Sequence, residues 1–461
     1  MSAKMYPYIP NSDERVQREM LEYIGAASID ELIADIPEDM RMKQKMNLPE
    51  AVSDEAGLFR HVGSMLDKNK TARELVCFLG AGCYNRYVPA VVDEVVNRSE
   101  FLTAYAGEPY EDHGRFHAMF EYQSMMAELL DMDVCNVPNY DGSQAVGTAL
   151  RMAARITRRK EVLIPRNVNP DTLRAVQTYL QPDISITYVD YSAKSGRICL
   201  DSLKEKLTDK AAAVLVMNPN FFGVIEESAQ DIAELAHANG ALMVAWVEPS
   251  TLGLLTPPSR YGADIACGDI QGLGLHMNYG GGVAGFIATK DEPRFVDEYP
   301  SRLFGVAPTS EREWGFGDVL WERTSFANRD GAKEFVGTHS ALWGIAAGVY
   351  LAAMGPQGMK ELGEAVVQRQ LCLRKLLSGV KGISFDRFSG TPFQEVVADF
   401  SASGKKVSEI NRKLLEKGIL GGYDLGGSFP ELEGCMLLAV TEQTSADDIK
   451  ALASALGEIL A

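Results

Sequence analysis

Short β-rich runs alternate with helical segments between about residues 71 and 330, and this alternation constrains the fold most strongly. The β-rich runs are EVLIP (161–165), SITYVDY (185–191), AAAVLVMNP (211–219) and ALMVAWVEP (241–249). Helical segments such as TLRAVQTYL (172–180) and ESAQDIAELAHANG (227–240) lie between them. Strands that alternate with helices of this length are joined by right-handed crossovers. The sequence therefore predicts an α/β fold with a mostly parallel sheet and helices on both faces.

A helical arm is predicted ahead of the sheet, over residues 1–70. The segment SDERVQREMLEYIG (12–25) has apolar residues at helical spacing, and Gly25 is expected to end that helix. The next segment, SIDEL, has the pattern of a capping box. In such a box the Ser28 hydroxyl accepts from the Glu31 amide, and the Glu31 carboxylate accepts from the Ser28 amide.

A small α+β domain is predicted at the C-terminal end. It begins with HSALWGIAAGVYLAAMG (339–355) and a long helix near 358–379, and continues with the expected strands GISFDRF (382–388), FQEVVADF (393–400) and CMLLAVTE (435–442). Expected helices are KVSEINRKLLEKGI (406–419) and SADDIKALASALGEIL (445–460). We therefore expect an arm over 1–70, a large α/β domain over 71–334 and a small α+β domain over 335–461.

Charge and cysteine usage narrow the functional classes. With 461 residues, the chain exceeds the roughly 250–300 residues of a single core. A net charge of −18 argues against binding to nucleic acid or to an anionic membrane surface, because both need a basic face. The seven cysteines have no C-x-x-C spacing and the six histidines no helical metal spacing, so we expect reduced thiols and no metal centre. With no apolar leader at the N-terminus, we expect a cytoplasmic protein.

The segment NYDGSQAVGTAL predicts a glycine-containing turn that opens a helix. The amides of Gly142, Ser143 and Gln144 point to a phosphate cradle at the positive end of that helix. An ordinary capped helix after a turn has the same pattern, so both interpretations remain open.

An acid follows the last residue of one predicted strand, in WVEPSTLG. Pyridoxal enzymes of the aspartate-aminotransferase fold place an acid there, paired with the pyridinium nitrogen of the cofactor. Glu248 has one methylene more than the usual aspartate. A plain loop carboxylate is the alternative.

The stretch GADIACGDIQGLGLHMNYGGGVAG (262–285) resembles the part of a pyridoxal-phosphate enzyme that presents the Schiff-base lysine to the cofactor. The interval between Arg260 and Lys290 contains no lysine. Lys290 ends the next predicted strand, so we expect it on the wrong side of the sheet. A Schiff base needs a primary amine, so this chain is not expected to hold the cofactor covalently.

Taken together, these segments resemble the N-terminal half, subunit 1, of the two-chain glycine dehydrogenase (decarboxylating), the P-protein of the glycine cleavage system. The matching segments run from one end of the chain to the other. They are YIPNSDERVQREMLEYIGAASIDEL, FLGAGCYNRYVPAVVDEVVNRSEFLTAY, FEYQSMMAELLDMDVCNV, YDGSQAV, NPNFFGVIEE, STLGLLTPPSRYGADIACGDIQGLG, GGYDLGGSFPELEG and LLAVTEQTSADDIKAL.

The resemblance implies an aminotransferase-like fold (type I of the pyridoxal-phosphate enzymes) and an active site shared between two subunits. A lysine-bearing subunit 2 would bind pyridoxal phosphate covalently, in an α₂β₂ assembly, and the lipoyl arm of an H-protein would enter at the interface. By position, the resemblance places Tyr105, Arg329 and Thr338 in the pocket wall. It gives supporting roles to Asn85, Tyr87, Glu121, Tyr122 and Gln123.

The sequence also departs from this family in segments that approach the shared site. Arg86 and Asn169 replace usual histidines, His117 replaces a usual glutamine, Pro138 and Gln144 alter the glycine turn, and the loop after Tyr105 is one residue shorter. A retained scaffold with a rewritten pocket suggests a paralogue that acts on another amino acid or carrier. An unchanged reaction with variable loops is the alternative. Two further hypotheses are a catalytically silent structural or regulatory subunit and a self-sufficient pyridoxal enzyme that uses Lys333.

Overall fold

The computed structural model describes residues 8–9, 11–44, 46–52, 54–102, 113–280, 284–334 and 340–461. By its contacts, the chain divides into two compact units, Met1–Asn69 and Lys70–Ala461. No helix in these described ranges is long and apolar enough to cross a lipid bilayer.

The first unit consists of short helices without a core of their own. They are α1 (Glu14–Ile24), α2 (Ile29–Leu32), η1 (Glu38–Met40) and α3 (Glu55–Leu66), and none of them contains a buried residue. Gly25 ends α1 in the left-handed conformation (φ 75°), as predicted. The capping box is only half correct. The Ser28 hydroxyl accepts from the Glu31 amide, but the Glu31 carboxylate accepts from the amide of Ala27 instead of Ser28.

The second unit is built around a seven-stranded sheet in the described part of the chain, with strand order β2-β8-β7-β6-β5-β3-β4. Its strands are β2 (Val134–Cys135), β3 (Glu161–Pro165), β4 (Ser185–Val189), β5 (Ala211–Asn218), β6 (Leu242–Val247), β7 (Ile265–Asp269) and β8 (Gly285–Thr289). Neighbouring strands from β4 to β7 are parallel, whereas β8 is antiparallel to both β7 and β2. The predicted mostly parallel sheet is confirmed.

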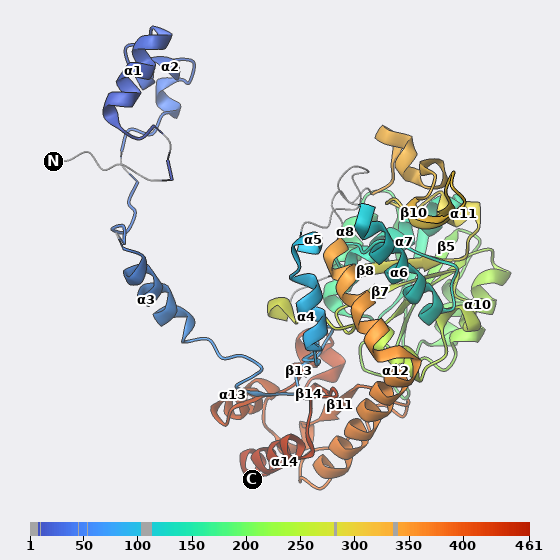
Figure 1. Ribbon diagram of the computed structural model, residues 1–461. Coiled ribbons are helices and arrows are strands. Elements are labelled where there is room, and N and C mark those ends of the chain that lie inside the picture. The colour runs from blue at the N-terminus through green and yellow to red at the C-terminus, as the bar shows by residue number, and fades with distance from the viewer. Residues whose placement is uncertain are drawn as a thin grey trace. The chain divides into compact units, whose positions relative to one another are not determined.

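Helices cover both faces of this sheet (Figure 1). Side chains of α4 (Ala90–Val96), α6 (His113–Leu130), α9 (Leu200–Lys206), α10 (Ala229–Ala238) and the first half of α12 (Ala341–Leu377) share one buried cluster with it. Side chains of α7 (Gly142–Thr157), α8 (Pro170–Leu180) and α11 (Pro293–Val296) share the cluster on the other face. Alternate residues of β5 belong to the two clusters, as expected for a strand buried on both sides.

The C-terminal elements lie together at one end of the second unit (Figure 1). Helix α12 bends at Gly355 (φ 60°), directly before Pro356, and leads to a three-stranded sheet of order β11-β14-β13. The elements are β11 (Glu395–Asp399), α13 (Val407–Glu416), β13 (Tyr423–Asp424), β14 (Cys435–Ala439) and α14 (Ala446–Leu460). The strand expected at 382–388 is wrong, because only an isolated bridge between Ser384 and Asp399 forms there.

The remaining elements are short connections. They are β1 (Val76–Cys77), α5 (Ser99–Leu102), β9 (Phe304–Pro308), β10 (Trp314–Asp318), β12 (Ile419–Leu420), η2 (Pro249–Gly253), η3 (Pro258–Tyr261), η4 (Asn278–Gly280), η5 (Trp321–Arg323), η6 (Ser325–Gly331), η7 (Ser401–Ser403), η8 (Leu425–Gly427) and η9 (Pro430–Leu432).

One buried cluster contains both Phe222, after β5, and Leu437 of β14. The boundary expected at residues 334 and 335 stays a prediction.

Candidate active site

The candidate site lies at the carboxyl edge of the large sheet, where β5, β6 and β7 end. Ligands of open α/β sheets bind at this edge. The N-terminus of α7 meets the same edge, because the Gly142 amide donates to the Asp269 carboxylate at 3.1 Å. A Cβ on Gly142 would lie 2.8 Å from the backbone nitrogen of Asp269, so close packing of helix against strand requires glycine here.

Two of the three amides proposed for a phosphate cradle at the start of α7 are already occupied. Gly142 donates to Asp269, and Gln144 donates to the N-cap residue Asp141 at 2.8 Å. The Ser143 hydroxyl pairs with the Thr172 hydroxyl at 3.0 Å. Two carboxylates next to these donors would repel a phosphate. The structure therefore favours the ordinary capped helix over the phosphate cradle.

Asp269 is a buried acid with an altered protonation equilibrium. Burial raises the pKa of its carboxyl to about 7, although the amides of Gln271 and Gly142 donate to it and pull the pKa down. The nearby acids Asp141 and Glu248 raise the pKa further. Close to neutral pH, Asp269 is therefore partly protonated.

Glu248 forms part of a buried ion pair with Arg86. Its carboxylate accepts from the Ser250 hydroxyl and lies 3.5 Å from a guanidinium nitrogen of Arg86. The other carboxylate oxygen, Oε1, is buried without a hydrogen-bond partner in the described part of the chain. Because Glu248 neutralises a cation of this chain, the structure favours the structural carboxylate over a partner for a pyridinium ring.

Arg86 is the centre of the polar network at this edge. Its guanidinium donates to Glu442 at 3.0 Å, to Ser250 at 2.6 Å and to Gln394 at 2.7 Å. Burial opposes the charge of Arg86, but the carboxylates of Glu248 and Glu442 outweigh burial and raise the pKa of the guanidinium. The network therefore joins the large sheet to the C-terminal elements through a permanently charged group.

Glu395, at the start of β11, brings another buried acid to the same place. Its carboxylate accepts from the Ala81 amide at 2.6 Å and from the Tyr84 hydroxyl at 3.1 Å. Burial raises the pKa of Glu395 to about 7. This edge thus gathers several acids around one buried arginine.

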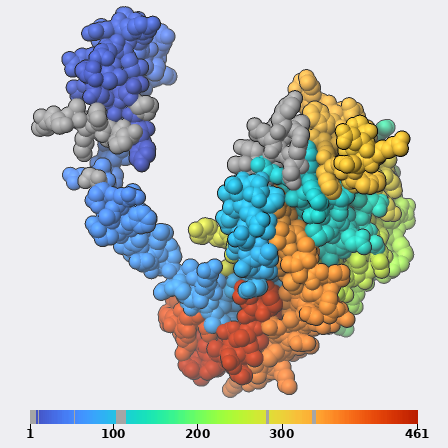
Figure 2. Space-filling view, viewed as in Figure 1, coloured from blue at the N-terminus to red at the C-terminus, as the bar shows by residue number. Residues whose placement is uncertain are grey.

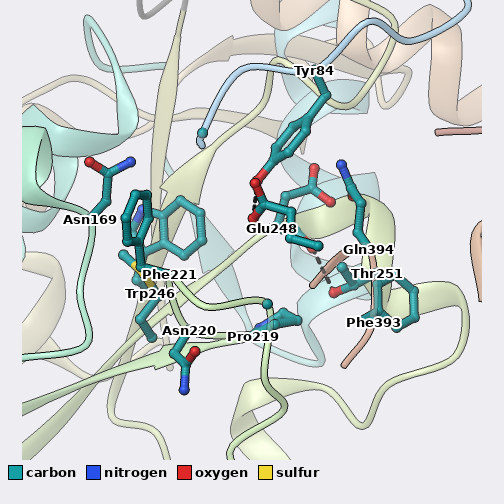
Figure 3. A pocket seen from close by; sticks show the side chains of 14 residues that line it. Tyr84, Asn169, Pro219, Asn220, Phe221, Trp246, Glu248, Thr251, Phe393 and Gln394 are labelled. Atoms are coloured by element: carbon teal, nitrogen blue, oxygen red, sulfur yellow. Dashed lines mark hydrogen bonds between the residues drawn. The ribbon is translucent and has the colours of Figure 1, made fainter. Parts of the chain in front are cut away.

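A small cavity remains among these groups (Figure 3). Aromatic and polar side chains surround it, and its volume is about 40 Å³. Binding sites for small organic molecules have volumes of roughly 300–1,000 Å³, whereas one water molecule takes roughly 30 Å³. The lining residues are Gly82, Tyr84, Asn169, Met217, Pro219, Asn220, Phe221, Gly223, Trp246, Glu248, Thr251, Phe393, Gln394 and Glu395.

Pyridoxal phosphate does not fit this edge of the chain. The cavity is too small for its ring, and carboxylates occupy two of the three helix amides that would bind its phosphate. Buried polar atoms of Trp246, Glu248 and Gln394 lack hydrogen-bond partners in the described ranges, a pattern that one or two bridging waters would satisfy. In the described ranges of the chain, no group of three or more acidic, histidine or cysteine side chains could hold a metal ion.

The predicted wall residues are only partly covered by the structure. Tyr105 and Thr338 lie outside the described residues. Arg329 is exposed in η6, with a backbone φ of 47° and ψ of −108°. Within the described residues, its guanidinium has no ion-pair partner.

Two of the predicted supporting residues flank Arg86. The Asn85 carbonyl accepts from the Thr441 hydroxyl at 2.7 Å, and the Tyr87 amide donates to Glu442 at 2.7 Å. Both line a polar hollow together with His276 and Asp93. The Tyr87 side chain is exposed. The structure therefore brings these two residues together near the sheet edge.

The other three supporting residues lie on α6 and have different environments. Glu121 is exposed and pairs with His117 at 3.0 Å. Tyr122 is fully buried beside Gly344 and Gly348 of α12. The Gln123 amide group donates to the Cys135 carbonyl at 2.5 Å and accepts from the Phe304 amide at 3.1 Å. Tyr122 and Gln123 therefore support the scaffold from inside.

The acids at the sheet edge were not recognised from the sequence as one cluster. Asp269 directly follows a predicted buried strand, which is a usable signal, but Glu395 and Glu442 are distant in sequence from Arg86. The unusual arginine in GCYNRYVPA was the only indication of a buried network.

Known proteins resemble this chain over its whole length. The family model described as glycine cleavage system P-protein matches residues 7–456. A probable glycine dehydrogenase (decarboxylating) subunit 1 from Pyrococcus horikoshii is 39% identical over 457 residues, which cover 98% of this chain and 99% of the relative. The subunit 1 of the same name from Geobacillus kaustophilus is also 39% identical, over 456 residues and the same shares.

Solved structures give the same result. A crystal structure of glycine decarboxylase, the P-protein of the glycine cleavage system in an inhibitor-bound form, superposes with a TM-score of 0.85 at 34% identity. The match covers 98% of this chain and 100% of that chain. A sphingosine-1-phosphate lyase from Burkholderia pseudomallei shares the fold, with a TM-score of 0.66 at 13% identity over 92% of this chain and 94% of that one. The predicted aminotransferase-like fold is confirmed.

The raised pKa values predict a stability that depends on pH. Unfolded Glu has a pKa near 4.3, whereas Glu395 in the folded chain has a pKa of about 7. The folded chain binds the proton of the Glu395 carboxyl more tightly than the unfolded chain does. The contribution of this proton to the free energy of unfolding is therefore fully present below about pH 4 and is lost as the pH rises through about 7. Glu395→Gln removes the ionisable group. The effect of this substitution on the free energy of unfolding should therefore be more favourable at pH 8 than at pH 5, by roughly 1–3 kcal/mol.

Urea denaturation at the two pH values measures this difference. Glu361→Gln, which changes an exposed glutamate of α12, gives the baseline. The assignment is contradicted if the effect of Glu395→Gln is the same at both pH values.

Proposed function

Because the chain belongs to the glycine cleavage system P-protein family, which it matches over residues 7–456, we propose that it is the non-lysine subunit of a two-chain, pyridoxal-phosphate-dependent glycine decarboxylase. Its relatives are named subunit 1 of glycine dehydrogenase (decarboxylating), and this name implies a second subunit. In our proposal subunit 2 carries the lysine and the cofactor, and the active site forms at the interface of an α₂β₂ assembly. A lipoyl H-protein then receives the aminomethyl group.

The position of the lysines carries this proposal. Between Arg260 and Lys290 the chain has none. Lys290 follows β8, which runs antiparallel to β7, with Gly285 opposite Asp269 and Thr289 opposite Ile265. Lys290 therefore lies at the amino edge of β7, on the far side of the sheet from the candidate site. In our proposal the reactive amine therefore comes from another polypeptide.

The small cavity supports the same assignment of roles to the two subunits. Arg86 pairs with Glu248, Asp269 accepts from the start of α7, and the remaining space suits water. A chain that fills its own sheet edge in this way has a scaffold role there. Its contribution to the reaction has to come from surfaces that face the partner.

The role proposed for this chain is to complete the partner's pocket. Pyridoxal phosphate, when bound, supplies an electron-accepting ring for the decarboxylation. Tyr105, Arg329 and Thr338 would exclude water and orient the substrate carboxylate. The described part of the chain provides no counter-ion for the exposed Arg329 guanidinium, and a guanidinium is well suited to bind a carboxylate.

The self-sufficient enzyme receives little support. Lys333 donates its amide to the Ser325 hydroxyl at 3.2 Å and lines a surface hollow with Arg151, Arg155 and Tyr179. That hollow shares no lining residue with the cavity at the sheet edge. Lys333 is therefore poorly placed to serve a cofactor there.

Three of the departures from the family are explained by contacts within the chain. Arg86 fills the sheet edge, and the Asn169 side chain donates to the Ala81 carbonyl at 2.9 Å. Gln144 belongs to a buried chain of hydrogen bonds with Asn139 and Thr148. These three changes repack the chain's own interior, so they give no reason to propose a different substrate. We therefore favour the glycine reaction over the paralogue.

The first test is whether the chain alone binds pyridoxal phosphate. We expect the purified chain to show no saturable aldimine absorbance when it is titrated with the cofactor, because the cavity is small and no lysine is in place. Lys333→Ala serves as a matched control and should behave identically. Saturable binding of one cofactor per chain that Lys333→Ala abolishes would establish the self-sufficient enzyme instead.

The second test distinguishes a subunit that contributes residues to the active site from a catalytically silent structural subunit. In the complex with subunit 2, Arg329→Ala should lower turnover about 10²-fold, the effect of losing substrate orientation, while assembly is retained. Arg412→Ala, which changes an exposed arginine of α13 paired with Glu416, should leave turnover unchanged. Unchanged turnover and assembly in Arg329→Ala would favour the silent subunit.

A further inference from the structure

The short turn η4 (Asn278–Gly280) has an unfavourable backbone. Asn278, Tyr279 and Gly280 have φ values of 45°, 60° and 81°. In the described residues, this is the only place where two adjacent non-glycine residues have positive φ. Side chains other than glycine disfavour this region, and a tyrosine there is a genuine outlier. Strained residues of this kind cluster at functional sites.

Nothing within the described chain compensates for this strain. The side chain of Tyr279 is completely exposed, with a relative accessibility of 107%. A Cβ added to the neighbouring Gly280 would meet no atom within 4 Å. In Figure 2 the yellow-green turn projects from the surface of the second unit. The turn thus presents a large aromatic side chain to whatever lies outside.

The base of the turn, by contrast, is firmly held. The buried Gln271 side chain accepts from the Tyr84 amide at 3.1 Å and donates to the Tyr84 and Leu275 carbonyls at 3.0 and 2.9 Å. The His276 ring pairs with Asp93 of α4 at 3.0 Å. A strained tip on a fixed base is pre-organised, so an incoming partner does not have to order it first.

The location of the turn links it to the candidate site. It belongs to the connection from β7 to β8, which starts at Asp269, at the carboxyl edge of the sheet. The polar hollow beside its base also contains Tyr87, whose side chain is 59% exposed. Tyrosines on rigid supports are enriched among the residues that dominate protein interfaces.

We propose that Tyr279 is the anchor that docks this chain onto the lysine-bearing subunit 2, next to the shared active site. This inference rests on the proposed function, because it needs that partner. In the complex, burial of the tyrosine ring in the partner offsets the backbone strain of the turn.

A glycine substitution at Tyr279 tests the proposal with two measurements: the stability of the isolated chain, which should not fall, and the affinity for subunit 2, which should fall. Glycine adopts positive φ without strain, so Tyr279→Gly should leave the Tm of the isolated chain unchanged or higher. The same substitution removes the anchor and should raise the Kd for cofactor-loaded subunit 2 of the same organism at least tenfold, measured by sedimentation. Tyr279→Phe keeps the ring and should stay within about threefold of the wild type.

Leu415→Ala, at an exposed position of α13, controls for the loss of any exposed apolar side chain and should not change the Kd. The proposal is overturned if Tyr279→Gly leaves the Kd within twofold, if it lowers the Tm, or if it weakens only self-association of this chain. If the wild-type chain itself does not bind subunit 2, the proposed function fails as well, and this outcome is distinct from the others.

Discussion

The buried guanidinium of Arg86 is the interaction on which the rest of the site depends. It links Glu248, which follows β6, to Glu442, which follows β14, and it does so in the interior. Taking charges out of water is unfavourable unless they are paired, and loss of one partner of a buried pair typically costs 3–5 kcal/mol. The cation therefore holds the large sheet and the C-terminal elements together and makes the acids around it tolerable.

This arrangement decides what the chain can do chemically. In related folds the carboxyl edge of the sheet is where a ligand binds, but here protein charges and a water-sized cavity take that space. The reactive amine is also missing from the segment that should present it. What remains available is the outer surface, with the exposed Arg329 of η6, the hollow near Tyr87 and the projecting Tyr279. The role proposed for this chain, completing another chain's pocket, relies on these surfaces.

The sequence predicted the fold well and the site only in part, for physical reasons. Alternating strand and helix patterns are local, so the sheet, the helices and the end of α1 at Gly25 were predictable. The Glu31 carboxylate accepts from the Ala27 amide instead of the Ser28 amide, and the sequence pattern alone does not resolve this difference of one residue. The occupied amides of α7 could not be foreseen, because Asp269 lies 127 residues away in sequence. Arg86 was recognised only as unusual, since its partners come from distant segments.

In the proposed complex, the amine that holds the cofactor belongs to the other polypeptide. The most direct measurement is borohydride reduction of the assembled complex with pyridoxal phosphate, followed by digestion and mass spectrometry of both chains. We predict one stoichiometric pyridoxyl-lysine in subunit 2 and none in this chain. A stoichiometric adduct on any lysine of this chain would contradict it.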